Sequence, residues 1–372
     1  MNRIKLIDRL YQGKLPRREF HQALGAFGLV ATVLPVMAPR RARAAGEFLY
    51  FTWAGFEDPG LFPAYAATYG GPPESTFYGD EYEGIEKLKA GFEADVVCPC
   101  IDVMPRWQTS GLQPIDESRL LYLDDVFDTL KGPADAFKDG QRYVVPTYWG
   151  FSSVCYNPEL SGITADEESW TLLYDERFKG RIGMWDSTDA VIPAASLAAG
   201  DTEDPYRPDG ERFEKVRALM RTQRDLVRFY WNDPSELIQA FAAGEIVVSF
   251  CWAGTYGAMK AENMPITWAH PKEGLISFNC GLARSNRTMD EAAVYDFINA
   301  SMAAEAGKYM IETFNYGAAN RKSFAMVDPA LLASINLSTP EESLAGSHSY
   351  QFVPHELKQL HINVFDEIKA GT

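Results

Sequence analysis

Aromatic and acidic residues stand where predicted strands of this chain give way to loops. In open α/β sheets, ligands bind beyond the strand ends, so these side chains are candidates for a binding site. Carboxylates combined with aromatic faces suit an ammonium group, through charge-assisted hydrogen bonds and cation–π contact. The pattern therefore predicts a site for a small cationic amine. The candidate set comprises Trp53, Phe56, Trp149, Asp186, Asp189, Trp252, Phe278, Tyr316 and Tyr350.

Two of these assignments have a structural alternative. Asp186 and Asp189 have a spacing that places both carboxylates on one side of a first helical turn, where they could instead cap a helix and complement its dipole. Each tryptophan could equally pack in a core.

No catalytic, phosphate-binding or metal-binding motif is present in the sequence. Gly-x-Ser-x-Gly, the P-loop pattern, His-Glu-x-x-His and Gly-x-Gly-x-x-Gly are all absent. Cys98 and Cys100 are too closely spaced for a metal or redox pair, and the histidines after residue 44 show no ligand spacing. We therefore expect no catalytic residues, no metal and no cofactor, which favours binding over catalysis.

The first 44 residues have the pattern of an export signal. Arg17 and Arg18 precede an apolar run over residues 23–38, and the small-x-small sequence 42–44 follows. The arginine pair indicates the twin-arginine route, with cleavage near Ala44 and a mature protein in the periplasm. The alternatives are a membrane anchor or an amphipathic helix, but the run falls short of the roughly 20 residues that a bilayer requires.

The charge of the chain disfavours a nucleic-acid partner. The whole chain carries −16 at pH 7, and residues 1–44 contribute nine Lys/Arg against two acids, so the remaining 328 residues carry −23. Phosphate binding needs a basic face, and this charge is compatible with a cationic ligand instead. The five cysteines are an odd number, which leaves at least one thiol free.

Short apolar strands alternate with helical patterns, which predicts an α/β fold. The chain is expected to cross between two halves at residues 146–150. An N-cap with Pro at N1 begins at Asp233, and a capping box runs from Thr288 to Glu291. The expected strands are 48–53, 76–78, 94–98, 143–145, 151–156, 181–185 and 246–251, and the expected helices are 61–69, 84–92, 190–199, 211–230, 237–243 and 292–313.

Six segments of the chain carry short motifs of one known family in the same order, at residues 51–56, 95–100, 111–116, 145–150 with 156–157, 169–181 and 271–274. In these segments the chain resembles the periplasmic polyamine-binding proteins of ABC importers, the spermidine/putrescine-binding group of the extracellular solute-binding proteins. Residues 51–56 resemble that family's Tyr-Asn-Trp-x-x-Tyr, and residues 271–274 read Pro-Lys-Glu-Gly as the family does. The resemblance covers nearly the whole chain after residue 44.

The resemblance implies a two-lobed periplasmic binding protein fold with crossover hinge strands and an interlobe ligand cleft. It implies an N-terminal lobe of residues 45–145 plus 275–319 and a C-terminal lobe of 146–274 plus 320–372. The chain would bind a polyamine or related organic amine, work as a monomer and present its ligand to an inner-membrane ABC permease, without catalysis.

The resemblance also assigns roles to individual residues. Trp53, Phe56, Trp252, Phe278 and Tyr316 would form aromatic walls. Asp186 and Asp189 would correspond to an Asp-x-x-Glu pair that binds one terminal amine, and Gln351 to a late glutamine contact.

Two departures bear on the ligand. The family places an Asp where this chain has Cys280, so one amine-anchoring carboxylate is missing, and Cys100-Ile101-Asp102 replaces Ser-x-Tyr. Asp102 would either supply the lost charge or face solvent. Cys100 and Cys280 are expected on opposite lobes, where a disulfide would lock the cleft, so we expect none to form.

Other functions remain open at this point. If the charge is not replaced, the ligand would be a monoamine, an amino-acid-like or an opine-like solute. An exported enzyme on the same fold could use Asp186, Asp189 or Cys280, and a sensor or scaffold could have lost ligand binding.

Overall fold

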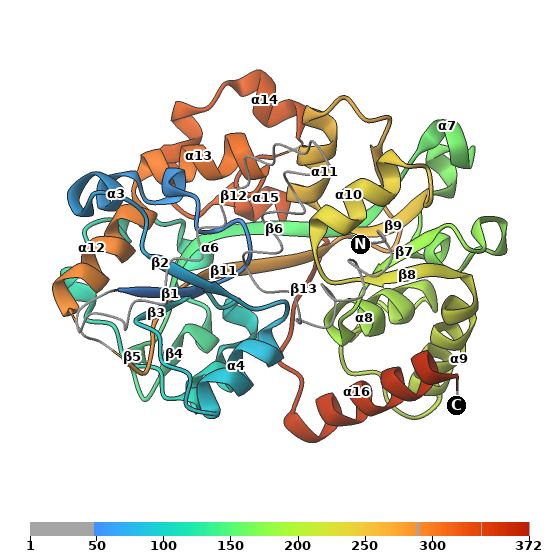
Figure 1. The fold of residues 1–372 in the computed structure, drawn as a ribbon, viewed down its shortest axis with the longest axis horizontal. Helices are drawn as coiled ribbons and strands as arrows, with labels where there is room; N and C mark the ends of the chain where they lie inside the picture. The colour runs from blue at the N-terminus through green and yellow to red at the C-terminus, as the bar shows by residue number, and fades with distance from the viewer. Residues whose placement is uncertain (1–47, 288–289, 336, 372) are drawn as a thin grey trace, which may run out of the picture. The chain divides into compact units, whose positions relative to one another are not determined.

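Parallel and antiparallel strands join into one sheet around which the helices pack (Figure 1). The computed structural model describes residues 48–287, 290–335 and 337–371, so the predicted export signal lies outside the described residues. The main path of the sheet has the strand order β2-β1-β3-β11-β6-β9-β7-β8. Its two ends are parallel βα units, and antiparallel strands join them in the middle.

The first βα units confirm the strands predicted near residues 48, 76 and 94. β1 (Leu49–Thr52) is buried at every position, as expected for a parallel strand covered on both faces, and pairs with β2 (Glu74–Phe77) and β3 (Val96–Val97). α3 (Pro63–Tyr69) and α4 (Glu81–Lys89) connect these strands. Asp80 caps α4 by accepting a hydrogen bond from the backbone N–H of Glu83.

The crossing between the two halves differs from the prediction. A single strand, β6 (Val145–Tyr156), runs through the segment that the sequence divided into two strands. Pro146 breaks the local strand pattern, but it lies opposite Gly281 at a register shift in β11 (Ile276–Arg284), and prolines are tolerated at such irregularities. A side chain at Gly281 would meet the carbonyl oxygen of Val145, so glycine is required there.

The second group of strands lies after β6 in the sequence. β7 (Ile182–Trp185) pairs in parallel with β8 (Val227–Trp231) and β9 (Val248–Trp252). The helices α8 (Thr188–Ala198), α9 (Gly210–Leu226), α10 (Pro234–Ala242) and α11 (Ala253–Ala261) accompany them. The predicted cap of α10 is confirmed, because Asp233 accepts a hydrogen bond from the N–H of Ser235.

Two helix predictions were too long. The helix predicted over residues 211–230 ends at Leu226, and its β-branched and aromatic end, Val227–Trp231, forms β8 because it pairs with β7. The helix predicted over 292–313 is divided at Ala303, whose backbone is extended, into α12 (Glu291–Met302) and α13 (Ala304–Phe314). Asp290 caps α12, and the predicted cap at Thr288 lies outside the described residues.

The C-terminal segment returns across the sheet. After β12 (Gly317–Ala318), the chain forms α14 (Pro329–Ser334), α15 (Pro340–Ser343) and the short strand β13 (His348–Ser349), which pairs with β11. It ends in α16 (His355–Ala370), which packs against α8 and α9 (Figure 1).

Buried apolar residues form separate cores on the two sides of the crossing. Two clusters surround β1, with Tyr50 and Phe51 as members, and we call this region the β1 side. A third cluster surrounds β7, with Met184 and Phe250 as members, and we call this region the β7 side. β6 and β11 are the crossover strands, since each contributes buried residues to both sides.

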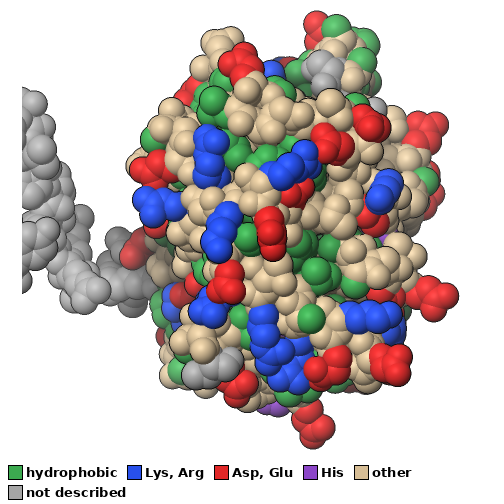
Figure 2. Space-filling view, turned by 90° about the vertical axis from the view of Figure 1, so that its right-hand side faces the viewer, with side chains coloured by type: hydrophobic (Ala, Val, Ile, Leu, Met, Phe, Trp, Pro, Cys, Tyr) green, Lys and Arg blue, Asp and Glu red, His purple; other side chains and the backbone are tan. Residues whose placement is uncertain are grey.

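The surface over α9 and the end of α16 carries acidic and basic side chains interspersed (Figure 2). Several form ion pairs along α9, such as Arg217 with Glu214 and Arg212 with Asp209. Such mixing of charges is typical of a solvated face. Within the described part of the chain, no helix has the length and apolar character needed to cross a membrane.

Candidate ligand site

A row of aromatic rings leads from the β1 side to the β7 side. Phe56 lies 4.9 Å from Tyr148, Tyr148 lies 5.7 Å from Tyr316, and Tyr316 lies 5.4 Å from Phe278, measured between ring centroids. Phe278 then lies 6.4 Å from Tyr350. We call these five residues the aromatic row. It brings together Phe56, Phe278 and Tyr316 of the predicted walls and adds Tyr148, which the sequence analysis missed.

The crossover strands position this row. Phe278 on β11 lies opposite Gly150 on β6, and a side chain at Gly150 would approach Tyr316 and Phe278 within 2.8 Å. The glycine therefore lets the two rings lie over the strand. Tyr350 follows β13 and packs against the cores of both sides, and it also contacts Tyr206 of the β7 side at 5.5 Å.

The predicted tryptophans lie elsewhere. Trp252, at the end of β9, packs against Trp185 at 4.9 Å and Trp231 at 5.0 Å, and it contacts the cores of both sides. Trp53 packs against Tyr78 at 4.6 Å and donates a hydrogen bond from Nε1 to the Cys98 carbonyl. Trp149 is fully buried in the core of the β1 side and packs against Phe151 at 5.8 Å. Among the ring contacts of the described residues, none joins these three predicted tryptophans to the aromatic row.

The two predicted carboxylates each meet a lysine of α16. Asp189 Oδ1 lies 2.5 Å from Lys358 Nζ, and Asp186 Oδ1 lies 2.7 Å from Lys369 Nζ. Neither aspartate is the N-cap of α8, because Ser187 caps that helix by accepting a hydrogen bond from the N–H of Asp189. These lysine partners were not foreseen from the sequence.

A pocket joins Asp189 to residues of the β1 side. Gln351 lines it as well, and its Oε1 accepts a hydrogen bond of 2.7 Å from Arg207. The structure thus places two predicted residues, Asp189 and Gln351, next to α4. The full lining is Glu81, Tyr82, Ile85, Val103, Arg106, Asp189, Gln351, Phe352, Val353 and Lys358.

Glu81 is a buried carboxyl group in this pocket that the sequence analysis missed. It accepts hydrogen bonds from the Cys100 N–H at 2.9 Å and from the indole N–H of Trp107. Burial raises its pKa to about 8, although both hydrogen bonds act in the opposite direction. Its signal in the sequence was its place directly after β2, at the edge where parallel strands present ligand-binding groups.

Tyr350, the last ring of the aromatic row, directly precedes Gln351, which lines the pocket. Burial raises the pKa of Tyr350 well above its ordinary value, and the nearby charges of Asp189 and Glu81 raise it further. The Tyr350 hydroxyl is therefore within electrostatic range of carboxyl groups from both sides. Tyr350 and Asp189, an aromatic and an acidic candidate predicted from the sequence, therefore interact electrostatically.

The expectation about Cys100 and Cys280 was wrong. They form a disulfide, and their backbones are bridged as antiparallel neighbours with Cα atoms 3.8 Å apart. The error came from placing them on opposite lobes: Cys280 lies on the part of β11 that belongs to the β1 side, next to Cys100. The bond therefore joins two segments of one side and does not lock the crossing. The side chain of Asp102 lies outside the described residues.

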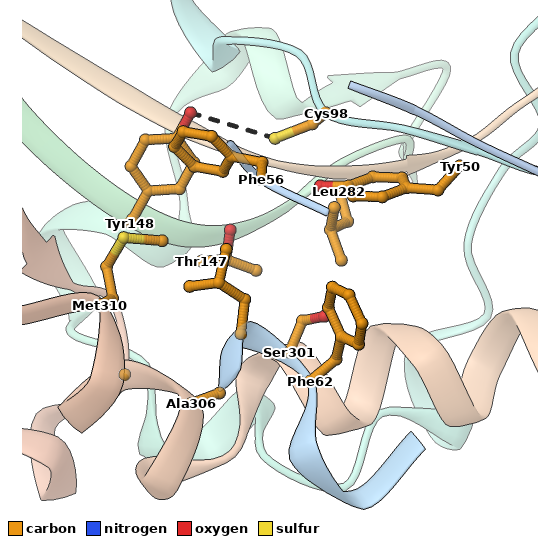
Figure 3. A pocket seen from close by; sticks show the side chains of 12 residues that line it. Tyr50, Phe56, Phe62, Cys98, Thr147, Tyr148, Leu282, Ser301, Ala306 and Met310 are labelled. Atoms are coloured by element: carbon orange, nitrogen blue, oxygen red, sulfur yellow. Dashed lines mark hydrogen bonds between the residues drawn. The ribbon is translucent and has the colours of Figure 1, made fainter. Parts of the chain in front are cut away.

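A second pocket lies inside the β1 side (Figure 3). Tyr50, Phe62 and Met310 are among its walls, and the Cys98 thiol donates a long hydrogen bond of 4.0 Å to the Tyr148 hydroxyl. Phe56 and Tyr148 belong both to this pocket and to the aromatic row. None of the residues that line this pocket has a charged side chain, so we do not assign it to an amine.

Comparison with known proteins agrees with this geometry. Residues 81–333 match the family of bacterial extracellular solute-binding proteins. The spermidine/putrescine-binding periplasmic protein of Escherichia coli K12 is 22% identical over 345 residues, covering 90% of this chain and 95% of the relative. The putrescine/agmatine-binding protein of Pseudomonas aeruginosa is 21% identical over 294 residues, covering 75% and 79%.

Solved structures show the same fold. A protein from Listeria monocytogenes described as a spermidine/putrescine ABC transporter superposes with a TM-score of 0.76 at 17% identity, covering 88% of this chain and 99% of that one. A binding protein of A. tumefaciens B6 in complex with glucopine gives 0.71 at 16%, covering 87% and 100%. The fold is therefore the two-lobed fold of periplasmic binding proteins, with β6 and β11 as its crossover strands. Because the family match spans well over half of the chain, this protein belongs to the bacterial extracellular solute-binding proteins.

Proposed function

We propose that this chain is the substrate-binding component of an ABC importer and that it binds a polyamine or a related organic amine between its two sides. The observation that carries the proposal is the aromatic row, whose five rings contact one another in succession from Phe56 to Tyr350. Aromatic faces bind ammonium groups by cation–π attraction. Relatives named for putrescine, agmatine or spermidine binding support this ligand class.

Ligand capture follows from the two crossover strands. β6 and β11 are the strands that lead from one core to the other, so they are the natural hinge for closure. A ligand that touches both sides only in the closed state shifts the population toward that state. An inner-membrane permease would then recognise the closed form.

We propose the predicted lobe boundaries with one change: residues 320–337, which the sequence analysis assigned to the C-terminal lobe, belong to the N-terminal lobe. Val327 and Leu337 pack in the core of the β1 side, whereas Val353 and Phe365 pack in the core of the β7 side. Within residues 320–372, the change of lobe therefore falls between Leu337 and Val353.

The remaining parts of the proposal concern cellular context. We propose export by the twin-arginine route with cleavage near Ala44, a periplasmic location, and a monomeric receptor without catalytic activity. Membership of a solute-binding family supports a binding role. Recovery of chemically unchanged ligand from the purified protein would support the absence of turnover.

Thermal-shift titration of the protein without residues 1–44 tests the proposal. We expect putrescine, spermidine, agmatine or a simple monoamine to raise the melting temperature, and Phe278→Ala to weaken that amine by about tenfold because it removes a ring from the aromatic row. Phe324→Ala is the matched control, since Phe324 pairs with Phe127 outside the row. If none of these amines stabilises the protein, the proposal is wrong.

A further inference from the structure

The Asp189 carboxylate already holds an ammonium group that belongs to the protein. Lys358 Nζ lies 2.5 Å from Asp189 Oδ1, and the two side chains are only 4% and 13% exposed. An ion pair this deeply buried is costly to open, because removing either partner leaves the other charged and desolvated. The carboxylate predicted to bind a ligand amine is therefore occupied from within the chain.

The second aspartate repeats the arrangement. Asp186 pairs with Lys369, which also lies over the rings of Phe365 and Tyr230. Lys358 and Lys369 are both on α16 and are eleven residues apart, close to three helical turns, so they lie on the same face. α16 thus presents two ammonium groups to the two aspartates around the start of α8, which it packs against (Figure 1).

The other acidic groups near the pocket do not replace Asp189. Burial raises the pKa of Glu81 to about 8, so this carboxyl group is mostly neutral at pH 7. Asp80, which interacts electrostatically with Asp189 and Lys358, is the cap of α4, and burial raises its pKa as well. Among the described residues that line the pocket, Glu81 and Asp189 are the carboxyl groups, so no ionised and unpaired one remains there.

The guanidinium group of Arg106 further disfavours a second ammonium group of a ligand in this pocket. Arg106 lines the pocket, donates a hydrogen bond of 2.7 Å to the Val353 carbonyl, and forms no ion pair among the described residues. A ligand with an ammonium group at each end would therefore place its second charge near Lys358 and Arg106 without a free carboxylate.

We propose that Lys358 is a specificity-determining residue that restricts this receptor to amines with a single positive charge. Lys358 pairs with the Asp189 carboxylate that a second ammonium group of the ligand would require. The single ammonium group of the ligand binds over the aromatic row. This inference rests on the proposed function, since it assumes that the ligand is an amine, and it narrows the class from polyamines to monoamines.

Two ligands matched in length test the role of Lys358. Putrescine and n-butylamine share a four-carbon chain and differ in the second ammonium. We expect the wild-type protein to bind butylamine at least as tightly as putrescine. Lys358→Met keeps the aliphatic stem and frees Asp189, so putrescine affinity should rise by about tenfold or more while butylamine affinity changes little.

Two further variants separate the mechanism from a folding defect. Lys369→Met is the matched control, because Lys369 is on the same helix face but does not line the pocket. This variant should leave the relative affinity for butylamine and putrescine unchanged. The double variant Lys358→Met with Asp189→Asn removes both charges, so it leaves no buried charge unpaired, and the gain for putrescine should disappear.

The outcomes distinguish this inference from the proposed function. If wild type binds putrescine about tenfold more tightly than butylamine and Lys358→Met does not improve putrescine further, Lys358 does not set the charge preference and the inference is overturned. If neither amine binds wild type or any variant, the proposed function itself fails.

Discussion

Glu81 and Asp189 occupy equivalent positions on the two sides of the molecule, yet their charge is controlled in opposite ways. Each begins or nearly begins the helix that follows a parallel strand, α4 after β2 and α8 after β7. Glu81 is held by neutral donors, the Cys100 N–H and the Trp107 indole, and burial favours its protonated form. Asp189 is held by the ammonium of Lys358.

A site can therefore contain acidic residues and still offer no free negative charge to a ligand. On the β1 side, desolvation outweighs two hydrogen bonds and neutralises the acid by protonation. On the β7 side, a lysine from the far end of the sequence neutralises it by pairing. Both arrangements disfavour a ligand with several ammonium groups.

Asp189→Asn tests the β7 side of this comparison and should have the largest effect. It leaves the Lys358 ammonium buried without its partner, so we expect the free energy of unfolding to fall by about 3 to 5 kcal/mol. Urea denaturation of the variant and the wild-type protein at pH 7 measures this loss of stability. A loss below about 1 kcal/mol would mean that the pair is solvated and weak, as surface pairs are.

Glu81→Gln tests the β1 side through its pH dependence. A buried acid with a raised pKa keeps its proton in the folded protein, so the wild-type free energy of unfolding falls as pH rises from about 4.5 to 8. Glutamine does not titrate, so the stability difference between variant and wild type should shift in favour of the variant across this range. A difference independent of pH would contradict the neutral carboxyl group.

His361 provides an internal reference for that experiment. Burial and the charge of Lys358 lower the pKa of His361 to about 4, so the folded state loses stability as pH falls from 6.5 toward 4. This pH dependence of the free energy of unfolding has the opposite sign to that of Glu81, and it is present in both the wild-type protein and Glu81→Gln. The difference between Glu81→Gln and wild type therefore isolates Glu81.

Asp186→Asn should have the smallest effect and sharpens the contrast with Asp189. The side chains of Asp186 and Lys369 are 24% and 29% exposed, so water screens the pair. We expect a loss of less than about 1 kcal/mol in the same urea experiment. An effect as large as that of Asp189→Asn would remove the distinction between the two aspartates.

Local patterns of the sequence predicted much of the fold. The fully buried strands β1 and β7 and the cap at Asp233 were foreseen because their signals lie within a few neighbouring residues. β8 was missed because Val227–Trp231 continues the apolar pattern of α9, and only pairing with β7 makes it a strand. The family resemblance supplied the two-lobed arrangement.

The site was predicted less completely, for a physical reason. Aromatic residues at strand ends were foreseen, and four of them meet in the aromatic row. The partners of Asp189 and Asp186 lie 169 and 183 residues away, so no spacing could reveal them. The Cys100–Cys280 bond was wrongly excluded because the two cysteines were placed on opposite lobes. β11, which brings them together on the β1 side, was not among the predicted strands.

The most direct test of the central claim is to identify the ligand that the purified protein carries. Native mass spectrometry followed by denaturing extraction would give the mass and the number of amino groups of the bound molecule. The account predicts an unmodified small organic compound with a single ammonium group. A diamine or polyamine bound to the wild-type protein would contradict the role of Lys358, and a ligand without any amine would contradict the proposed function.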